Sequence, residues 1–554
     1  MTPSPEAPGH PGRMPRQIPF IIANEGCERF SFYGMRNILT PFLVTSLLLA
    51  MPDELARKAY AKDVFHTFVI GVYFFPLLGG WLADRFFGKL HTIFWFSLVY
   101  CFGHALLAIF DHSVNGFFAG LFFIALGAGG IKPLVSSFMG DQFDDSNKHL
   151  AKVVFDAFYW IVNFGSLFAS LFMPVFLQSY GPRVAFGIPG VLMLVATTVL
   201  WLGRRRYVIV PLPPRDPDSM LRVARTALLT RDASGALGRG FYVAAIGPML
   251  AVLSLGVGMG ALHWLEFVEA FCLALVAVIA CGGLGVSMQL ERARGLHPDA
   301  AIDGVRGVLR VLVVFALTTP FYSLFDQKAT TWVLQGGDMH VPVWELHLGA
   351  LGVWETTFQP AQMQAVNPAL VMILIPLNNF VIYPWLRRRG WTLASIRRMN
   401  AGIAIAALAW IAAGALQLWI EAEPKHAIVF GSHTIVFGGY APSILWQLVP
   451  YAILTFSEVL VSATGLEFAY SQAPLAMKGV IMSFWALTTA IGSLWVLLVN
   501  SAVRNHAVTR AIAHTGLSET AFLMFFFAAF ALVVAGAFRL YASRYRTVDH
   551  YRRS

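Results

Sequence analysis

Long apolar runs separated by short polar segments cover almost the whole 554-residue chain. A membrane-spanning helix needs about 20 mostly apolar residues. This rule predicts a first set of six helices at 18–50, 61–83, 91–111, 114–140, 150–178 and 184–203. Two further apolar runs follow near 241–261 and 264–290, and a last set of six lies near 305–335, 361–386, 396–421, 442–471, 477–503 and 517–543. The pattern predicts an all-α polytopic membrane protein with about 14 transmembrane helices.

This six, two and six arrangement also predicts the domain organisation. We expect two six-helix bundles, at 18–203 and 305–543, with a cytoplasmic linker at 204–240 and an inserted helix hairpin at 241–290 between them. Residues 1–17 are rich in Pro and Gly and lack the apolar core of a signal peptide, so they are predicted to be a disordered cytoplasmic tail. Residues 544–554 form a second cytoplasmic tail. The segment 337–360, with Trp344 and Trp354, is expected at the outer interface, and 422–440 is expected to be an external loop.

Composition supports the membrane assignment. The chain is 57% hydrophobic and 13% charged, with a mean hydropathy of +0.64, whereas soluble domains are about 45–50% apolar and about 25% charged. The net charge of +10 is spread over short loops, so it indicates membrane orientation and not a nucleic-acid partner. The loops richest in Lys and Arg alternate along the predicted helices in a way that places both termini in the cytoplasm. We therefore expect a multi-pass protein of the inner (cytoplasmic) cell membrane.

Four ionisable side chains lie at helical spacing on one face of the first predicted helix: Glu25, Glu28, Arg29 and Arg36. Each costs roughly 2.5–3.5 kcal/mol at bilayer depth unless it faces a polar interior and finds a partner. The alternative is a helix end with snorkelling charges, but apolar sequence flanks the stripe on both sides. The stripe therefore predicts a charged wall along a water-filled pathway.

Two other predicted helices carry polar groups at membrane depth. Lys132 lies within 114–140 and is followed by Pro133; to snorkel, its side chain would have to pass two helical turns. Asn163 lies within 150–178. Its amide either forms a hydrogen bond between helices or binds a ligand, and both alternatives stay open. By contrast, no nucleotide-binding loop, metal cluster or nucleophile–base arrangement occurs in the sequence, so neither an enzyme nor a bound cofactor is expected.

Several motifs resemble known families. Residues 79–89, with Gly79, Asp84 and Arg85, resemble the signature loop of the major facilitator superfamily, in which glycines permit close helix approach. The stripe of the first helix, the glycine-rich segment around Lys132 and the segment 158–167 together resemble the proton-dependent oligopeptide transporter family. The inserted helix pair is similar to the bacterial branch of that family. The resemblance implies proton-driven import of di- and tripeptides by alternating access, with protons as the coupling ion. We expect the functional unit to be a monomer.

The resemblance also implies roles for single residues. Glu25, Glu28 and Arg29 match the family's proton-coupling motif, although Phe32 replaces a tyrosine of that motif. His66 matches a histidine that only part of the family has; it is either an outward-facing proton acceptor or a hydrogen-bonded histidine. Asp326 stands where the family often has glutamate and is a further proton-coupling candidate. The positions that match family substrate-binding residues are Arg29, Tyr33, Tyr73, Lys132, Asn163, Tyr322, Asn367, Glu458 and Trp485.

These residues suit a peptide zwitterion. Arg29 and Lys132 would hold its carboxylate. Glu458, with Asn163 and Asn367, would hold its ammonium group. The aromatic residues would line adaptable side-chain pockets, with ordinary helix packing as the alternative for each.

Some assignments concern gates and secondary candidates. Arg36 and Asp326 are expected to pair as an outer gate, because each would be costly alone in a membrane span. Lys132 and Glu458 are further gate candidates. Glu467 is either a gate residue or part of a helix-end ion pair, and His104 is expected to be a hydrogen-bonded core histidine.

Two rival functions remain at this point. A member of this family that moves nitrate or another small anion would not need the full Glu25–Glu28–Arg29 motif, which is intact here. The other rival is a peptide receptor that does not transport.

Overall fold

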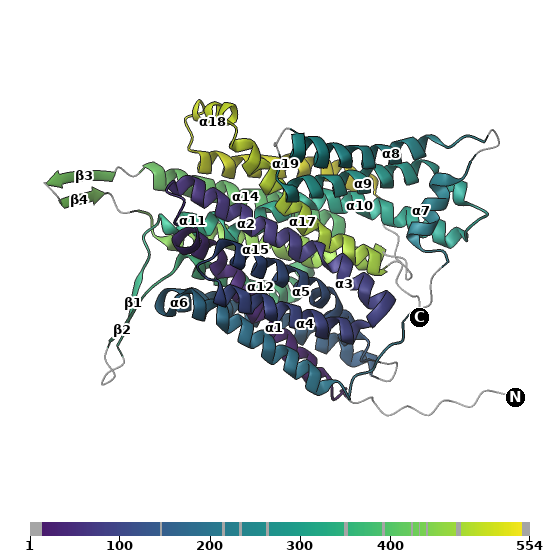
Figure 1. The fold of residues 1–554 in the computed structure, drawn as a ribbon, viewed down its shortest axis with the longest axis horizontal. Helices are drawn as coiled ribbons and strands as arrows, with labels where there is room; N and C mark the ends of the chain where they lie inside the picture. Colours follow the sequence, from purple (N-terminus) through teal and green to yellow (C-terminus); the bar gives the residue numbers. More distant parts are fainter. Residues whose placement is uncertain are drawn as a thin grey trace. The chain divides into compact units, whose positions relative to one another are not determined.

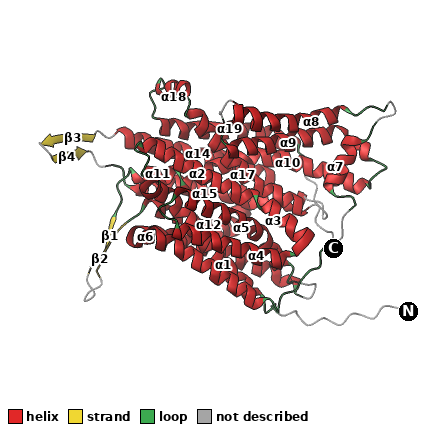
Figure 2. Cartoon of the chain, in the orientation of Figure 1, coloured by secondary structure: helices red, strands yellow, loops and turns green. Residues whose placement is uncertain are grey.

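The computed structural model describes most of the chain, and the described part is almost entirely helical (Figure 2). The described residues are 14–143, 147–212, 217–231, 235–261, 265–347, 353–389, 394–422, 425–430, 433–438, 441–472 and 478–545. Most of the two predicted tails, residues 1–13 and 546–554, lies outside them.

Twelve segments of the described chain are long and apolar enough to cross a membrane. One of them, Val153–Gly203, contains two of the predicted helices, which meet at Gly181, where φ is 77°. The helix that carries the charged stripe, α1 (Ile18–Phe42), is not among the twelve, because its four ionisable side chains lower its hydropathy. The set predicted from the sequence differs from these twelve segments only by the division at Gly181 and by α1. The fold class is therefore confirmed: a helical, polytopic membrane protein.

The chain forms two compact units, and each contains segments from both halves of the sequence. Unit 1 consists of Met1–Pro213, Lys328–Pro384 and Trp419–Ala452; unit 2 consists of Pro214–Gln327, Trp385–Leu418 and Ile453–Ser554. The bundle boundaries predicted from the sequence stay predictions.

Unit 1 contains the first six predicted spans and two segments of the second half, 328–384 and 419–452. Figure 1 labels its helices. Its helices after α1 are α2 (Glu54–Phe74), α3 (Pro76–Leu82), α4 (Lys89–Ile109), α5 (Val114–Gly140), α6 (Lys148–Gly203), α11 (Thr331–Gly337) and α12 (Val366–Leu377). Short π and 3₁₀ segments are Leu43–Leu47, Ala83–Phe87, Pro360–Ala365, Asn378–Ile382 and Ile444–Gln447.

Glycines bring the helices of unit 1 into close contact. A Cβ atom at Gly79 would lie 2.3 Å from the carbonyl oxygen of Gly129, so α3 and α5 can approach this closely only with glycine there. At the end of α5, the Lys89 ammonium contacts the Asp141 carboxylate at 2.6 Å. The loop at 79–89 thus shows the close helix approach that its glycines predict.

Segments of the second half of the chain are tied to α1 and α6 within unit 1. The Gln362 side chain donates to the Leu171 carbonyl of α6 at 2.8 Å. The Gln364 side chain donates to the Asn37 carbonyl of α1 at 3.3 Å. Hydrogen bonds from side chains to buried backbone carbonyls hold these segments in register.

Unit 2 contains the inserted hairpin and most of the remaining spans, but not Pro360–Ile382, which lies in unit 1. Its helices are α7 (Met220–Leu229), α8 (Arg239–Val252), α9 (Phe267–Gln289), α10 (Asp299–Asp326), most of α13 (Tyr383–Arg388) and α14 (Ser395–Ala422), most of α15 (Leu448–Glu458), α16 (Thr464–Gln472), α17 (Lys478–Val503), α18 (His506–Ala513) and α19 (Glu519–Arg544). Short π and 3₁₀ segments are Leu253–Ala261, Leu290–Ala293 and Val459–Ala463, and Gln327–Ala329 follows α10. The buried indole of Trp410 donates to the Leu324 carbonyl at 3.2 Å and thereby links α14 to α10.

The segments 337–360 and 422–440 each contain a β-hairpin. Strands β1 (Val343–His347) and β2 (Val353–Thr357) pair antiparallel, as do β3 (Lys425–Phe430) and β4 (His433–Gly438). Short runs rich in Val, Ile, Trp and Thr favour strands once a partner strand is adjacent. The expected positions of these two segments outside the membrane stay predictions. The side chains of Trp344 and Trp354 lie outside the described part of the structure.

Candidate functional site

The charged stripe of α1 is buried, as its sequence predicts. Glu25 and Glu28 have no exposed surface, and the Arg29 side chain is 14% exposed. The Nε atom of Arg29 donates to Glu25 Oε1 at 2.6 Å and lies 3.2 Å from Glu28 Oε2. One guanidinium group thus contacts two carboxylates, and the contact to Glu25 is the shorter.

Glu28 is the less satisfied of the two carboxylates. Neither of its oxygens accepts a hydrogen bond from the described residues, and the second oxygen of Glu25 accepts none either. A buried carboxylate normally accepts several hydrogen bonds, and one that accepts none is costly. Arg29 is therefore the cation that the two carboxylates of α1 share.

A second cation completes this cluster. The Lys132 ammonium of α5 lies 3.2 Å from the centre of the Phe32 ring and 5.0 Å from that of Tyr73. Aromatic faces attract cations, most strongly where water is excluded. Phe32, the departure from the family motif, therefore still interacts with Lys132, through the face of its ring. We call Glu25, Glu28, Arg29 and Lys132 the buried cluster.

Arg36 and His66 lie against the same aromatic residue. The Arg36 guanidinium is 5.2 Å from the centre of the Phe65 ring, and the buried His66 ring lies 5.3 Å from it. His66 is thus enclosed near a permanent cation, and its role as a proton acceptor stays a prediction.

The two asparagines of the predicted site have different partners. Asn163 donates to the Tyr159 carbonyl of its own helix at 3.0 Å, and its role as a ligand-binding amide stays a prediction. Asn367 accepts a hydrogen bond from the Lys328 ammonium at 2.7 Å. Sequence analysis did not single out Lys328, although a lysine two residues after Asp326 in an apolar run meets the criterion that identified Lys132.

Four predicted site residues lie in unit 2. The rings of Tyr322 and Trp485 are 6.0 Å apart and nearly perpendicular, and both residues are largely buried. Trp485 also packs on Gly465, where a Cβ atom would lie 2.0 Å from the ring. Asp326 is buried at the end of α10, and Glu458 ends α15.

Two secondary candidates have structural partners. Glu467 lies 3.5 Å from Arg398, which favours the helix-end ion pair over a gate. His104 is buried, and its Nε2 atom lies 3.2 Å from the Ser31 hydroxyl, as expected for a core histidine.

Within unit 1, the structure brings Glu25, Glu28 and Arg29 together. It places Lys132 on the ring faces of Phe32 and Tyr73. The predicted gate pair Arg36–Asp326 joins residues of the two units, and so does the pair of gate candidates Lys132 and Glu458. These pairings stay predictions.

Two sets of apolar helices with buried opposite charges at membrane depth define a polytopic membrane protein of the transporter class. The POT family (PTR2) matches residues 90–517, and the chain belongs to this family. This confirms the resemblance found in the sequence.

Solved structures and curated relatives agree with this assignment. The chain is 61% identical to an autoinhibited POT family peptide transporter, with 98% of this chain and 99% of that chain covered and a TM-score of 0.89. It is 59% identical to the POT family transporter PepTSo, with 98% and 100% covered and a TM-score of 0.89. "Peptide transporter 3" of Caenorhabditis elegans is 32% identical over 421 residues, which are 74% of this chain and 51% of the relative. "Solute carrier family 15 member 1" of Oryctolagus cuniculus is 31% identical over 432 residues, 74% of this chain and 52% of the relative. The chain spans about half the length of the curated relatives it matches.

Proposed function

We propose that this protein is a proton-coupled symporter that imports di- and tripeptides by alternating access. The observation that carries the proposal is the buried cluster, in which one guanidinium serves two buried carboxylates. A transporter that couples two ligands needs groups whose charge state changes when the substrate binds. Membership of the POT family and the likeness to proteins named as peptide transporters support the choice of peptides.

The peptide carboxylate is the ligand that competes for Arg29. The guanidinium fork of Arg29 suits a carboxylate, and Lys132 adds a second positive charge. When Arg29 turns toward the peptide, its longer contact, to Glu28 at 3.2 Å, is the first to break. A buried carboxylate without a cation is costly, and a proton removes that cost. Peptide binding and protonation thereby favour the same state.

The remaining predicted residues complete the proposed site. Asn163, Asn367 and Glu458 would bind the peptide ammonium, and Tyr33, Tyr73, Tyr322 and Trp485 would receive its side chains. The Lys328–Asn367 hydrogen bond suggests that a peptide ammonium replaces Lys328 on the same oxygen. The protein would act as a monomer in the inner cell membrane with both termini in the cytoplasm, and protons would be the only coupling ion.

Uptake of labelled dialanine into proteoliposomes with an imposed inward proton gradient tests the proposal. Accumulation above equilibrium, abolished by a protonophore, is the expected result. Binding without accumulation would identify a receptor. Uptake of nitrate or another small anion without peptide uptake would identify an anion transporter, and either result would overturn the proposal.

A further inference from the structure

Helix α7 lies in the linker, between the ends of two membrane spans. The preceding span ends at Gly203 and the following one begins at Arg239. Within unit 2, α7 packs against the 3₁₀ segment Leu290–Ala293, which ends another span, and against α10. Since its neighbours are span ends, α7 lies at the level of a membrane surface.

The orientation of α7 about its axis is set by polar contacts. Val223 and Ala227 are buried. The Gln289 side chain donates to the Ala227 carbonyl at 2.9 Å. His297 lies between the Asp218 carboxylate, at 2.7 Å, and the Thr226 hydroxyl, at 2.9 Å. These contacts fix which face of α7 is covered by unit 2.

The opposite face of α7 contains only leucine and arginine. Its four exposed residues are Leu221, Arg222, Arg225 and Leu229, and the two leucines are 81% and 46% exposed. At 100° per residue these four positions span about one quarter of the helix circumference. A face that met only water would have no reason to expose two leucines among so few positions.

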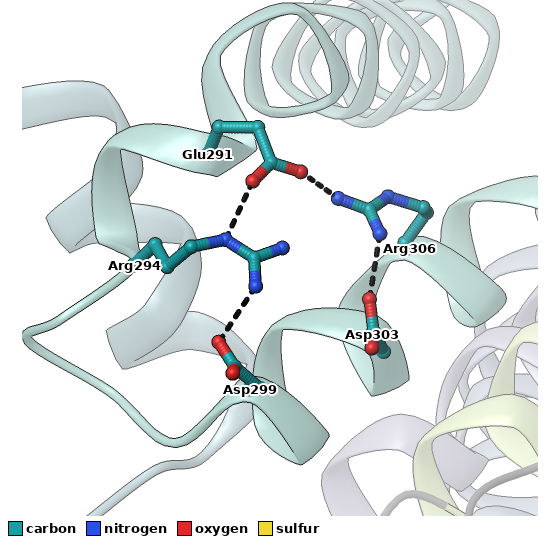
Figure 3. Close-up of polar contacts among 5 residues, drawn as sticks. All are labelled: Glu291, Arg294, Asp299, Asp303 and Arg306. Atoms are coloured by element: carbon teal, nitrogen blue, oxygen red, sulfur yellow. Dashed lines mark hydrogen bonds and ion pairs between the residues drawn. The ribbon is translucent and has the colours of Figure 1, made fainter.

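The arginines of this face are not neutralised locally. Among the described residues, the side chains of Arg222 and Arg225 form no hydrogen bond or ion pair. The neighbouring acids of the described residues are paired with other groups. Figure 3 shows Glu291 paired with Arg294 and Arg306, Asp299 with Arg294, and Asp303 with Arg306. Asp218 contacts His297. Within the part of the chain that the structure describes, no carboxylate therefore neutralises Arg222 or Arg225.

We infer that the exposed face of α7 binds anionic phospholipid headgroups at the membrane surface. The leucines enter the boundary between headgroups and acyl chains, and the arginines bind phosphate. Because α7 is joined to the inserted hairpin by Gln289 and packs against α10, lipid binding also anchors these elements at the surface. This would give the inserted hairpin a role in positioning α10.

The test measures whether anionic lipid covers Leu221. The Leu221→Cys variant of the full chain is reconstituted in vesicles of phosphatidylcholine alone or with one third phosphatidylglycerol, and its initial rate of reaction with an uncharged polyethylene glycol maleimide is measured. The four native cysteines lie within apolar helices, and the unmodified chain gives their background. We expect the reaction rate of the introduced cysteine to fall severalfold with the anionic lipid. The rate should recover at high salt, because salt screens the attraction between the arginines and the anionic lipid. Each arginine near an anionic leaflet increases the binding constant for that leaflet by a factor of about five.

Two variants make the result specific. When Arg222→Gln and Arg225→Gln are added to the Leu221→Cys chain, the reaction rate in anionic vesicles should return to the rate in phosphatidylcholine alone. Val508→Cys on α18 is the matched control, because that exposed helix has a single arginine, whose side chain donates to the His506 carbonyl. Its rate should not depend on lipid charge. Equal Leu221→Cys rates in both vesicles, or protection that survives the two arginine substitutions, would overturn the inference. None of these measurements requires transport, so they are independent of the proposed function.

Discussion

The buried cluster on α1 and the exposed charge network at the start of α10 contain the same kinds of groups in opposite surroundings. In the exposed network every charged side chain has a partner: Arg294 contacts Glu291 and Asp299, both at 2.8 Å, and Arg306 contacts Asp303 at 2.6 Å (Figure 3). In the buried cluster, where a partner matters more, Glu28 accepts no hydrogen bond from the described residues. The exposed charges are thus all paired where pairing contributes little, whereas the buried Glu28 is poorly satisfied where an unpaired charge is most costly.

The difference indicates which region has a function beyond folding. Exposed ion pairs contribute little to stability, and solvent replaces them easily. A buried group left poorly satisfied lowers stability, so its presence calls for another explanation, and use by a substrate or a proton is one. The predictions that follow change one region at a time and compare the effects.

The largest effect is expected for Arg29→Ala. It leaves Glu25 and Glu28 buried without their shared cation, which costs about 3–5 kcal/mol for a broken buried pair. Gradient-driven dialanine uptake should be lost, and the unfolding midpoint in detergent should fall. Arg294→Ala, in the exposed network, is the control and should change neither. A stable, active Arg29→Ala variant would contradict the role of the cluster.

Lys132→Gln should weaken peptide binding. It removes a charge-assisted contact worth roughly 1.5–3 kcal/mol, so the dissociation constant should rise about 10- to 100-fold. Binding of labelled dialanine to the purified protein measures this. Lys89→Gln breaks the ion pair with Asp141 outside the site and serves as the control. Equal affinities in Lys132→Gln and the unmodified chain would remove Lys132 from the substrate site.

His66→Gln should change the pH dependence of uptake while leaving peptide exchange largely intact. The buried ring next to Phe65 is the proposed proton acceptor. His104→Gln is the matched control, because His104 is equally buried and contacts Ser31. This substitution should change stability but not the pH dependence of uptake. A normal pH profile in His66→Gln would favour a purely structural histidine.

The smallest effect is expected for Glu291→Gln. It removes a charge that contacts Arg294 and Arg306 at the surface, where water replaces the lost contacts. Uptake and the unfolding midpoint should both remain unchanged. A loss of uptake comparable to that of Arg29→Ala would mean that burial does not distinguish the two regions.

The sequence predicted the spans and the buried cluster well, for identifiable reasons. Apolar runs of about 20 residues have few alternatives to a membrane helix. Charges at helical spacing inside such a run must share a face, which is why Glu25 and Arg29 were expected to lie together. These predictions use only local geometry.

Features that depend on neighbours in space could not be predicted in the same way. The β1–β2 pairing requires a second strand at the correct register. The partner of Asn163 is its own helix backbone, and the Lys328–Asn367 bond joins positions 39 residues apart. Helix α7 lies in the segment predicted as a polar linker, because its ten residues are too few to span a membrane. Which of its apolar residues face away from unit 2 becomes known only from their burial.

Glu28→Gln tests the central claim most directly, since it mimics permanent protonation of the carboxylate with the weaker contact to Arg29. Two measurements on the same proteoliposomes are compared: accumulation of dialanine under an inward proton gradient, and exchange of labelled for unlabelled dialanine without a gradient. We predict that accumulation is lost and that exchange survives. Accumulation at the level of the unmodified chain would contradict the account and would make Glu25 the next candidate for the coupling site.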